Sequence, residues 1–280
     1  MGDLADKMKL KLQLLGRSKH TVDTYMRYAS GFVRFHMRSP LEMGEPEVRA
    51  WLRHLMVEKK AEPDLLRCQI AAVKFLYIQV IGRLEPVSWI PWPKKIRRLP
   101  SVLSLGEVSS LIDAAPSLRT RAFIEASYGA GLRITEICNL RIEDVDSKRG
   151  VLFLRSTKGR KDRIAPLPER LLLTLREYYR AVRPAGPWMF PGKPKHNPIQ
   201  RQSVYEGFRI ALAVAKLTRA VKFHSLRHAF ATHLLEEGVD IVTIQSMMGH
   251  AWVSSTQVYL HVRTDRILAV GSPLDRLPEP

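Results

Sequence analysis

The hydrophobic pattern of the first third of the chain predicts a small bundle of helices. After Ser18, apolar residues recur at steps of three and four positions, with Lys and Arg on the opposite face. These apolar positions are Val22, Tyr25, Ala29, Phe32 and Val33. Two further apolar stripes run over residues 48–57 and 65–81. Consecutive amphipathic helices of this length favour an all-helical unit.

The pattern changes between Pro86 and Pro100. Four prolines fall in this stretch together with Trp89, Trp92 and a basic run, a composition that cannot continue a helix. We therefore expect a domain boundary here. The basic run consists of Lys94, Lys95, Ile96, Arg97 and Arg98, and it is consistent both with a solvated linker and with a DNA contact.

The remaining residues predict helices and one hairpin. Ser104 and Glu107 have the spacing of a capping box, which predicts a helix through residues 111–114. Apolar and polar residues alternate over residues 151–155 and 163–167, and the turn between these two arms is rich in Lys and Arg. Most of the rest follows a helical period, apart from a loop rich in Pro and Gly over residues 184–198. The expected fold is mainly α with a small antiparallel β-sheet.

The composition of the chain indicates the chemical class of its binding partner. The 280 residues include 45 Lys and Arg against 27 Asp and Glu, a formal net charge of +18, which favours a polyanion such as nucleic acid. The sequence has no apolar run of membrane-spanning length and begins with a charged segment, so we expect a cytoplasmic protein. The two cysteines, Cys68 and Cys138, each lie in a helix-like apolar pattern and are expected to be buried free thiols.

A candidate phosphate site lies at His224 and Arg227. Residues three apart on a helix point from the same face, so an imidazole and a guanidinium would converge on one ligand. A guanidinium matches two oxygens of a phosphate, and an imidazole can move a proton near neutral pH. His224 and His228 also have the spacing of metal ligands, but a third ligand and the Glu of a His-Glu-x-x-His motif are missing. Ordinary helix residues are the other interpretation of this stretch taken alone.

Three weaker signals flank this pair in sequence. Gly249 has the position of a helix terminator after an apolar stripe over residues 241–248, and His250 follows it. Tyr259 comes nine residues later, where a tyrosine is normally an amphipathic core residue. Upstream, Arg133 follows two glycines that permit a close approach of backbone and ligand.

Together these segments resemble the tyrosine recombinases, also called phage integrases. The family carries an Arg, a hairpin Lys, a His-x-x-Arg pair, a later His and a nucleophilic Tyr in this order. All six positions are filled here, by Arg133, Lys158, His224, Arg227, His250 and Tyr259. The resemblance implies a helical core-binding domain over residues 1–88, a basic linker over 89–101, a catalytic domain over 102–265 and a tail over 266–280.

The resemblance also implies a chemistry without metal or nucleotide cofactor. Tyr259 would attack the scissile phosphate while Arg133 and Arg227 clamp it, and Lys158 would protonate the leaving 5′-oxygen. His224 would accept the phenolic proton, His250 would bind the phosphate, and Glu136 would orient a neighbouring His or Arg. The expected partner is double-stranded DNA with specific recombination sites, bound by a homotetramer on two sites in the nucleoid. The expected DNA contacts are Lys94, Lys95, Arg97, Arg98, Arg160 and Lys161.

Several alternatives stay open at this stage. A type IB topoisomerase shares the Arg, Lys, His and Tyr chemistry, although the His-x-x-Arg form favours a recombinase. A catalytically silent DNA-binding protein on the same fold is the alternative from another class. Within the family, the linker and the closing residues 272–277 resemble recombinases of bacterial mobile elements, and chromosome-dimer resolution is the second interpretation.

Overall fold

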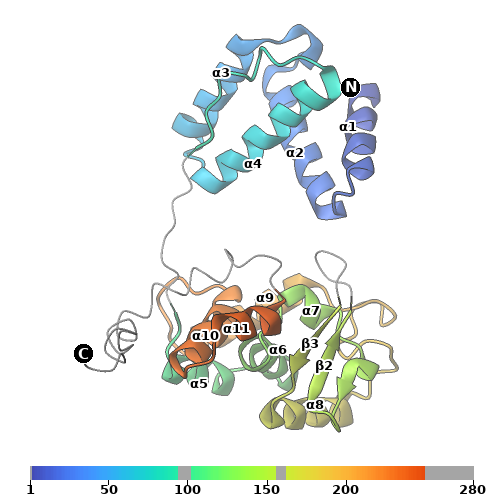
Figure 1. Ribbon diagram of the computed structural model, residues 1–280, viewed down its shortest axis with the longest axis vertical. Coiled ribbons are helices and arrows are strands. Elements are labelled where there is room, and N and C mark those ends of the chain that lie inside the picture. The colour runs from blue at the N-terminus through green and yellow to red at the C-terminus, as the bar shows by residue number, and fades with distance from the viewer. Residues whose placement is uncertain (1, 94–101, 156–161, 250–280) are drawn as a thin grey trace, which may run out of the picture. The chain divides into compact units, whose positions relative to one another are not determined.

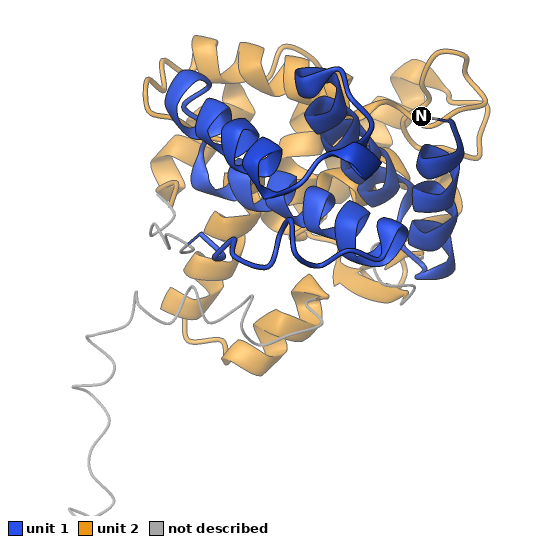
Figure 2. Cartoon of the chain, turned by 90° about the horizontal axis from the view of Figure 1, so that it is seen from above, with its two compact units in different colours: residues 1–98 blue, residues 99–280 orange. Residues whose placement is uncertain are grey.

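The structure is a computed structural model that describes residues 2–93, 102–155 and 162–249 (Figure 1). The chain divides into two compact units, residues 1–98 and residues 99–280, which are distinguished by colour in Figure 2. Within the described ranges the protein is mainly helical, with one three-stranded antiparallel sheet, so the expected fold class is confirmed. None of the described helices is long and apolar enough to cross a membrane.

The first unit is entirely helical over its described residues. Its elements are α1 (Gly2–Leu14), α2 (Lys19–His36), the 3-10 helix η1 (Pro40–Glu42), α3 (Glu45–Arg53), the π-helix η2 (His54–Glu58), α4 (Pro63–Lys74) and the π-helix η3 (Phe75–Ile81). The helix expected after Ser18 is confirmed, since the Ser18 side chain accepts a hydrogen bond from the amide of Thr21 and caps α2. The buried face of α2 contains Val22, Ala29, Phe32 and Val33. Helix α1 was not predicted, because its apolar residues are interrupted by charge.

The tryptophans at the end of this unit contact basic side chains. The Arg49 guanidinium lies 4.0 Å from the centre of the Trp89 ring, and the Lys74 ammonium lies 5.0 Å from that of Trp92. Trp89 is half-buried, and its indole N–H donates to the carbonyl of Pro86. Both rings therefore pair with cations of their own unit.

One expectation about the cysteines is wrong. Cys138 is buried, but Cys68 is exposed, although both thiols are free as expected. The reason is the orientation of α4, which buries Leu66, Ile70, Ala72 and Val73 and so turns position 68 towards solvent.

The second unit surrounds one buried helix. Its elements are α5 (Leu105–Asp113), α6 (Leu118–Gly129), α7 (Ile134–Cys138), the 3-10 helix η4 (Ile142–Asp144), β1 (Val145–Asp146), β2 (Val151–Leu154), β3 (Arg163–Pro166), α8 (Glu169–Val182), α9 (Arg201–Val214), α10 (His224–Glu236) and α11 (Ile241–Met248). Helix α6 packs against α5, α8, α9 and α10, and residues 122–127 are buried all round it. The capping box at the start of α5 is confirmed, with reciprocal hydrogen bonds between Ser104 and Glu107.

The expected hairpin is present, and its register sets the direction of the side chains. Strands β2 and β3 are antiparallel, with Leu152 opposite Ala165 and Leu154 opposite Arg163. Because side chains alternate along a strand, Arg163 lies on the same face as Ala165, which is buried. The short strand β1, which pairs with β2, was not predicted.

Candidate active site

The site begins at the turn that presents Arg133. Gly131 has φ +63°, and a Cβ at this position would lie 2.6 Å from the ring of Phe230, so only glycine fits. Two residues later Arg133 occupies the cap position of α7, where its backbone N–H donates to Oε2 of Glu136 at 2.7 Å. The Gly-Leu-Arg segment is therefore a tight turn that fixes the start of α7.

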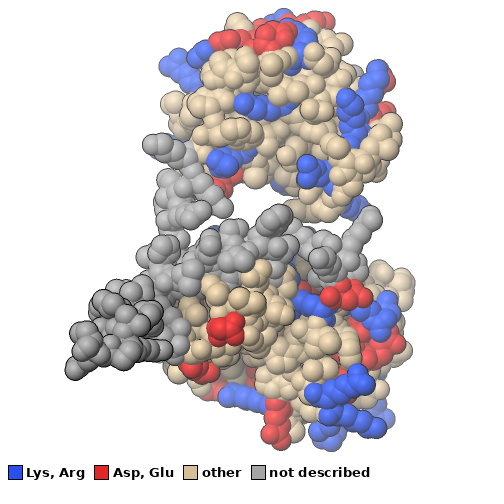
Figure 3. Space-filling view, viewed as in Figure 1, with Lys and Arg blue, Asp and Glu red and all other residues tan. Residues whose placement is uncertain are grey.

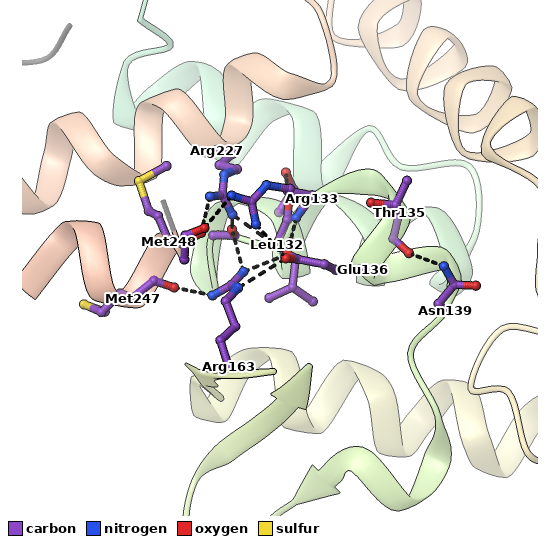
Figure 4. A network of polar contacts seen from close by, with 12 residues as sticks. Leu132, Arg133, Thr135, Glu136, Asn139, Arg163, Arg227, Met247 and Met248 are labelled. Carbon is purple, nitrogen blue, oxygen red and sulfur yellow. Dashed lines mark hydrogen bonds and ion pairs between the residues drawn. The ribbon is translucent and has the colours of Figure 1, made fainter. Parts of the chain in front are cut away.

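Glu136 lies at the centre of three arginines (Figure 4). Its carboxylate accepts from Nη1 of Arg133 at 2.8 Å, and from Nη2 and Nε of Arg163 at 2.7 and 3.2 Å. The Nη1 atom of Arg227 lies 3.9 Å away. Burial by itself raises the pKa of Glu136, but the hydrogen bonds and charge of Arg163, followed by those of Arg133, outweigh it and hold the pKa below its ordinary value. Glu136 is therefore an anion at neutral pH.

The end of helix α11 joins the same cluster. The carbonyl of Met247 accepts from Arg163, that of Met248 from Arg227, and that of Gly249 from Arg133 at 2.8 Å. Gly249 ends the helix in the left-handed conformation, with φ 58°, which confirms the predicted terminator. The carbonyl end of a helix carries partial negative charge, so three cations stabilise the last turn of α11.

Helix α10 contributes Arg227 and His224. The Arg227 side chain is fully buried and donates to the carbonyls of Gly131 and Met248. His224 is the first residue of α10 and lies near the surface, with its ring 4.5 Å from that of His228 in an edge-to-face arrangement. Loss of hydration, and then the charges of Arg227 and Arg133, lower the pKa of His224. At neutral pH this imidazole is therefore predominantly neutral and able to accept a proton.

The cluster has the charge of an anion site. Three arginines and one glutamate leave two positive charges in excess, in a place where the low dielectric strengthens their attraction for an anion. By contrast, basic and acidic side chains are intermixed on the visible face of both units (Figure 3). The buried cluster therefore marks the site better than the surface charge does.

The structure describes three of the six expected catalytic residues. Arg133 and Arg227 belong to this cluster, and the charges of both arginines lower the pKa of His224. The other expected residues lie outside the described ranges: Lys158, His250 and Tyr259, and the DNA contacts Lys94, Lys95, Arg97, Arg98, Arg160 and Lys161. Among the described residues no group of three His, Cys, Asp or Glu side chains could hold a metal ion.

Sequence reasoning missed Arg163. Arg163 is not among the site residues expected from the sequence, but its side chain is only 9% exposed and is paired with Glu136. The signal that could have found it is the alternation of Arg163 with Ala165 and Leu167, which gives all three the same inward face.

Comparisons with known proteins identify the family of this chain. Residues 101–266 match the phage integrase family, and residues 4–85 match the N-terminal SAM-like domain of phage integrases. The chain is 37% identical over 281 residues to a putative integrase/recombinase, y4qK, of Sinorhizobium fredii, covering 100% of this chain and 91% of that protein. It is 33% identical over 267 residues to the tyrosine recombinase XerA of Pyrococcus horikoshii, covering 95% of this chain and 91% of that protein.

A solved structure agrees in fold. The crystal structure of a lambda integrase tetramer bound to a Holliday junction matches with a TM-score of 0.73 at 18% identity, covering 90% of this chain and 78% of that chain. The chain belongs to the phage integrase family, whose members are the tyrosine recombinases. It is a tyrosine-type site-specific recombinase.

Proposed function

We propose that this recombinase cleaves DNA by attack of the Tyr259 hydroxyl on a scissile phosphate, which leaves a 3′-phosphotyrosine and a free 5′-hydroxyl. The observation that carries the proposal is the buried arginine cluster around Glu136, with its excess of positive charge beside a neutral His224. Phosphoryl transfer depends mainly on positioning and on neutralising the oxygens of the transition state. Fixed guanidinium groups supply both.

Each remaining residue has a role in this scheme. Arg133 and Arg227 exchange their hydrogen bonds with backbone carbonyls for bonds to the phosphate oxygens, and His224 accepts the proton of the Tyr259 hydroxyl. Lys158 protonates the departing 5′-oxygen, and His250 donates a hydrogen bond to the phosphate. The covalent link keeps the energy of the broken phosphodiester, so a 5′-hydroxyl can attack it and rejoin the strands.

The proposed substrate is double-stranded DNA with specific recombination sites, bound by a tetramer on two sites. The solved relative on a Holliday junction is a tetramer, which supports this assembly. The first domain, residues 1–88, and the linker, residues 89–101, would add contacts to the phosphate backbone. Such contacts make affinity fall steeply with salt. We favour a mobile element as the biological setting, because the linker and residues 272–277 resemble recombinases of bacterial mobile elements. The 37% identity to a putative integrase/recombinase is compatible with this setting.

The test is covalent trapping on nicked duplexes drawn from the DNA that flanks the gene. The natural chain should form an adduct that survives denaturation, and Tyr259→Phe should form none while binding the same duplex with similar affinity. An adduct that persists in Tyr259→Phe would contradict the assignment of the nucleophile.

The alternative functions predict different results in the same assay. A silent DNA-binding protein would bind the duplexes but form no adduct with any of them. A topoisomerase would form the adduct and relax supercoils without exchanging strands between two sites. Chromosome-dimer resolution would require exchange at a chromosomal site, and not at the ends of an element.

A further inference from the structure

Arg163 joins three separate segments of the second unit. Its Nε and Nη2 bind both oxygens of Glu136 on α7, and Nη2 also lies 3.4 Å from the carbonyl of Gly131. Its Nη1 donates to the carbonyl of Met247 in the last turn of α11. One guanidinium on β3 therefore fixes the turn before Arg133, the start of α7 and the end of α11 (Figure 4).

The packing around Gly249 shows how closely Arg163 fits this place. A Cβ at Gly249 would collide with Cδ of Arg163 and would lie 3.0 Å from its Nε. Gly249 is therefore required by its left-handed backbone and by the contact with the Arg163 side chain.

Arg163 is held by the chain through every nitrogen of its guanidinium. Its Nε and Nη2 donate to the two oxygens of Glu136 and its Nη1 donates to the carbonyl of Met247. This direct pairing with Glu136 distinguishes it from Arg227, whose Nη1 lies 3.9 Å from the same carboxylate. The charge of Arg163 acts through Glu136. With Arg163 paired to Glu136, the charges of Arg133 and Arg227 are left in excess for a phosphate.

We propose that Arg163 is a positioning residue for strand cleavage: it neutralises Glu136 and holds the end of α11, so that the arginine clamp keeps the geometry of the reaction. In sequence, Arg163 follows the hairpin turn that contains Lys158, and Gly249 directly precedes His250. The positioning role in cleavage rests on the proposed function, while the anchoring of α11 does not.

Arg155 provides a matched control on the same hairpin. It follows β2, and its Nε donates to Asp144 at 2.7 Å, with Glu143 at 3.0 Å from Nη2. Its side chain is 54% exposed, and its ion pairs among the described residues are with Glu143 and Asp144, outside the cluster around Glu136. Arg155→Gln therefore removes an arginine and two ion pairs near the turn without changing any residue of the cluster.

The experiment compares the full natural chain with Arg163→Gln, Arg163→Lys and Arg155→Gln. Three quantities are measured: the single-turnover rate of adduct formation on a nicked duplex at saturating protein, the dissociation constant at two salt concentrations, and hydrogen exchange of amides 245–249. We expect Arg163→Gln to lower the rate by about 100-fold, because a small displacement of reacting groups costs this much, while affinity changes less than about threefold. Exchange in α11 should accelerate by about tenfold or more.

The conservative and double variants separate positioning from simple loss of folding. Lys keeps the charge but cannot bind both oxygens of Glu136 together with the Met247 carbonyl, so Arg163→Lys should lose about tenfold in rate. Adding Glu136→Gln to Arg163→Gln removes the unbalanced anion, and the double variant should cleave faster than Arg163→Gln alone. Arg155→Gln should stay within about threefold of the natural chain in rate and affinity.

Three results would overturn the proposal. They are a natural cleavage rate in Arg163→Lys, a loss of affinity that matches the loss of rate with a salt dependence reduced by one phosphate contact, or unchanged exchange in α11 of Arg163→Gln. If the natural chain forms no adduct on any duplex, the proposed function fails and the role of Arg163 in cleavage fails with it. The exchange measurement then still decides whether Arg163 anchors α11.

Discussion

Two glutamates of the second unit are buried to a similar degree but differ in what surrounds them. Glu125 on α6 is 4% exposed and Glu136 on α7 is 2% exposed. One oxygen of Glu125 accepts from Arg121 at 3.2 Å and from Arg170 at 3.3 Å, and its other oxygen has no hydrogen-bond partner among the described residues. Glu136 uses both oxygens.

The two glutamates differ in how exposed their arginine partners are and in which elements those arginines connect. Those of Glu125 are 39% and 57% exposed and link only α6 with α8, so water screens them. Those of Glu136 are 24%, 9% and 0% exposed, and they extend to β3, α10 and the end of α11. A buried carboxylate alone does not mark a functional site. A site is indicated where several buried cations depend on one anion and join elements that are distant in sequence.

The largest expected effect comes from removing the central anion. Glu136→Ala leaves Arg163 and Arg227 buried without their carboxylate and should lower the free energy of unfolding by about 3–5 kcal/mol, as measured by urea denaturation. The pKa of Glu136 is lowered in the folded state, so its contribution to stability is present above the ordinary carboxyl pKa of 4.5 and is lost as the pH falls through the lower pKa of the folded chain. If Glu136→Ala lowers the free energy of unfolding by less than about 1 kcal/mol, Glu136 contributes no more to stability than is expected of Glu125.

The next effect concerns the turn that supplies a carbonyl to the cluster. Gly131→Ala adds a Cβ 2.6 Å from the Phe230 ring at a position with φ +63°, and it should cost about 2–4 kcal/mol through strain and overpacking. Gly150→Ala is the matched control, because its φ is +65° and no atom lies within 4 Å of the added Cβ. It should cost about 1–2 kcal/mol. Equal losses in thermal or urea unfolding would show that the Phe230 contact is irrelevant.

The burial of His228, which lies beside His224 on α10, can be tested through the pH dependence of stability. Loss of hydration, and then His224 and Arg227, lower the pKa of His228 to about 4 from 6.5. Between these two pH values the His228 imidazole is protonated in the unfolded chain but not in the folded chain. The free energy of unfolding should therefore fall by about 2–3 kcal/mol at most as the pH drops from 6.5 to 4. His228→Gln should flatten this part of the curve of unfolding free energy against pH. An unchanged slope would exclude His228 as its source.

The smallest effect is expected at the other glutamate. Glu125→Gln removes a buried charge whose arginines are largely solvated, so the free energy of unfolding should change by less than about 1 kcal/mol, in either direction. The rate of adduct formation should also stay within about threefold of the natural rate. A loss comparable with that of Glu136→Ala would remove the distinction between the two environments.

The sequence predicted the local elements well where one face of the element carries the pattern. Helix α2, the capping box of Ser104 and Glu107, the hairpin and the end of α11 at Gly249 are each encoded within a few residues. It missed α1, whose apolar positions are broken by charge, and it misjudged Cys68, because an apolar neighbourhood does not tell which face of α4 is buried.

For the candidate site, the order and type of Arg133, His224 and Arg227 could be recognised in the sequence, because each lies in a short motif and the family keeps them in a fixed order. The same information identified the family. The environment of Glu136 could not be predicted, since its partners lie 27 and 91 positions away in sequence, in β3 and α10.

The sequence by itself determined the class of protein, the helical composition and the identity of the candidate catalytic residues, because these depend on residue type and on short spacings. Only the tertiary structure decided that Arg163 faces inward, that Glu136 holds three arginines and Glu125 two solvated ones, and that α11 ends against Arg163. The physical reason is that burial and charge pairing depend on which elements pack together, and the free energy of a buried charge is set by all the neighbours that replace its water.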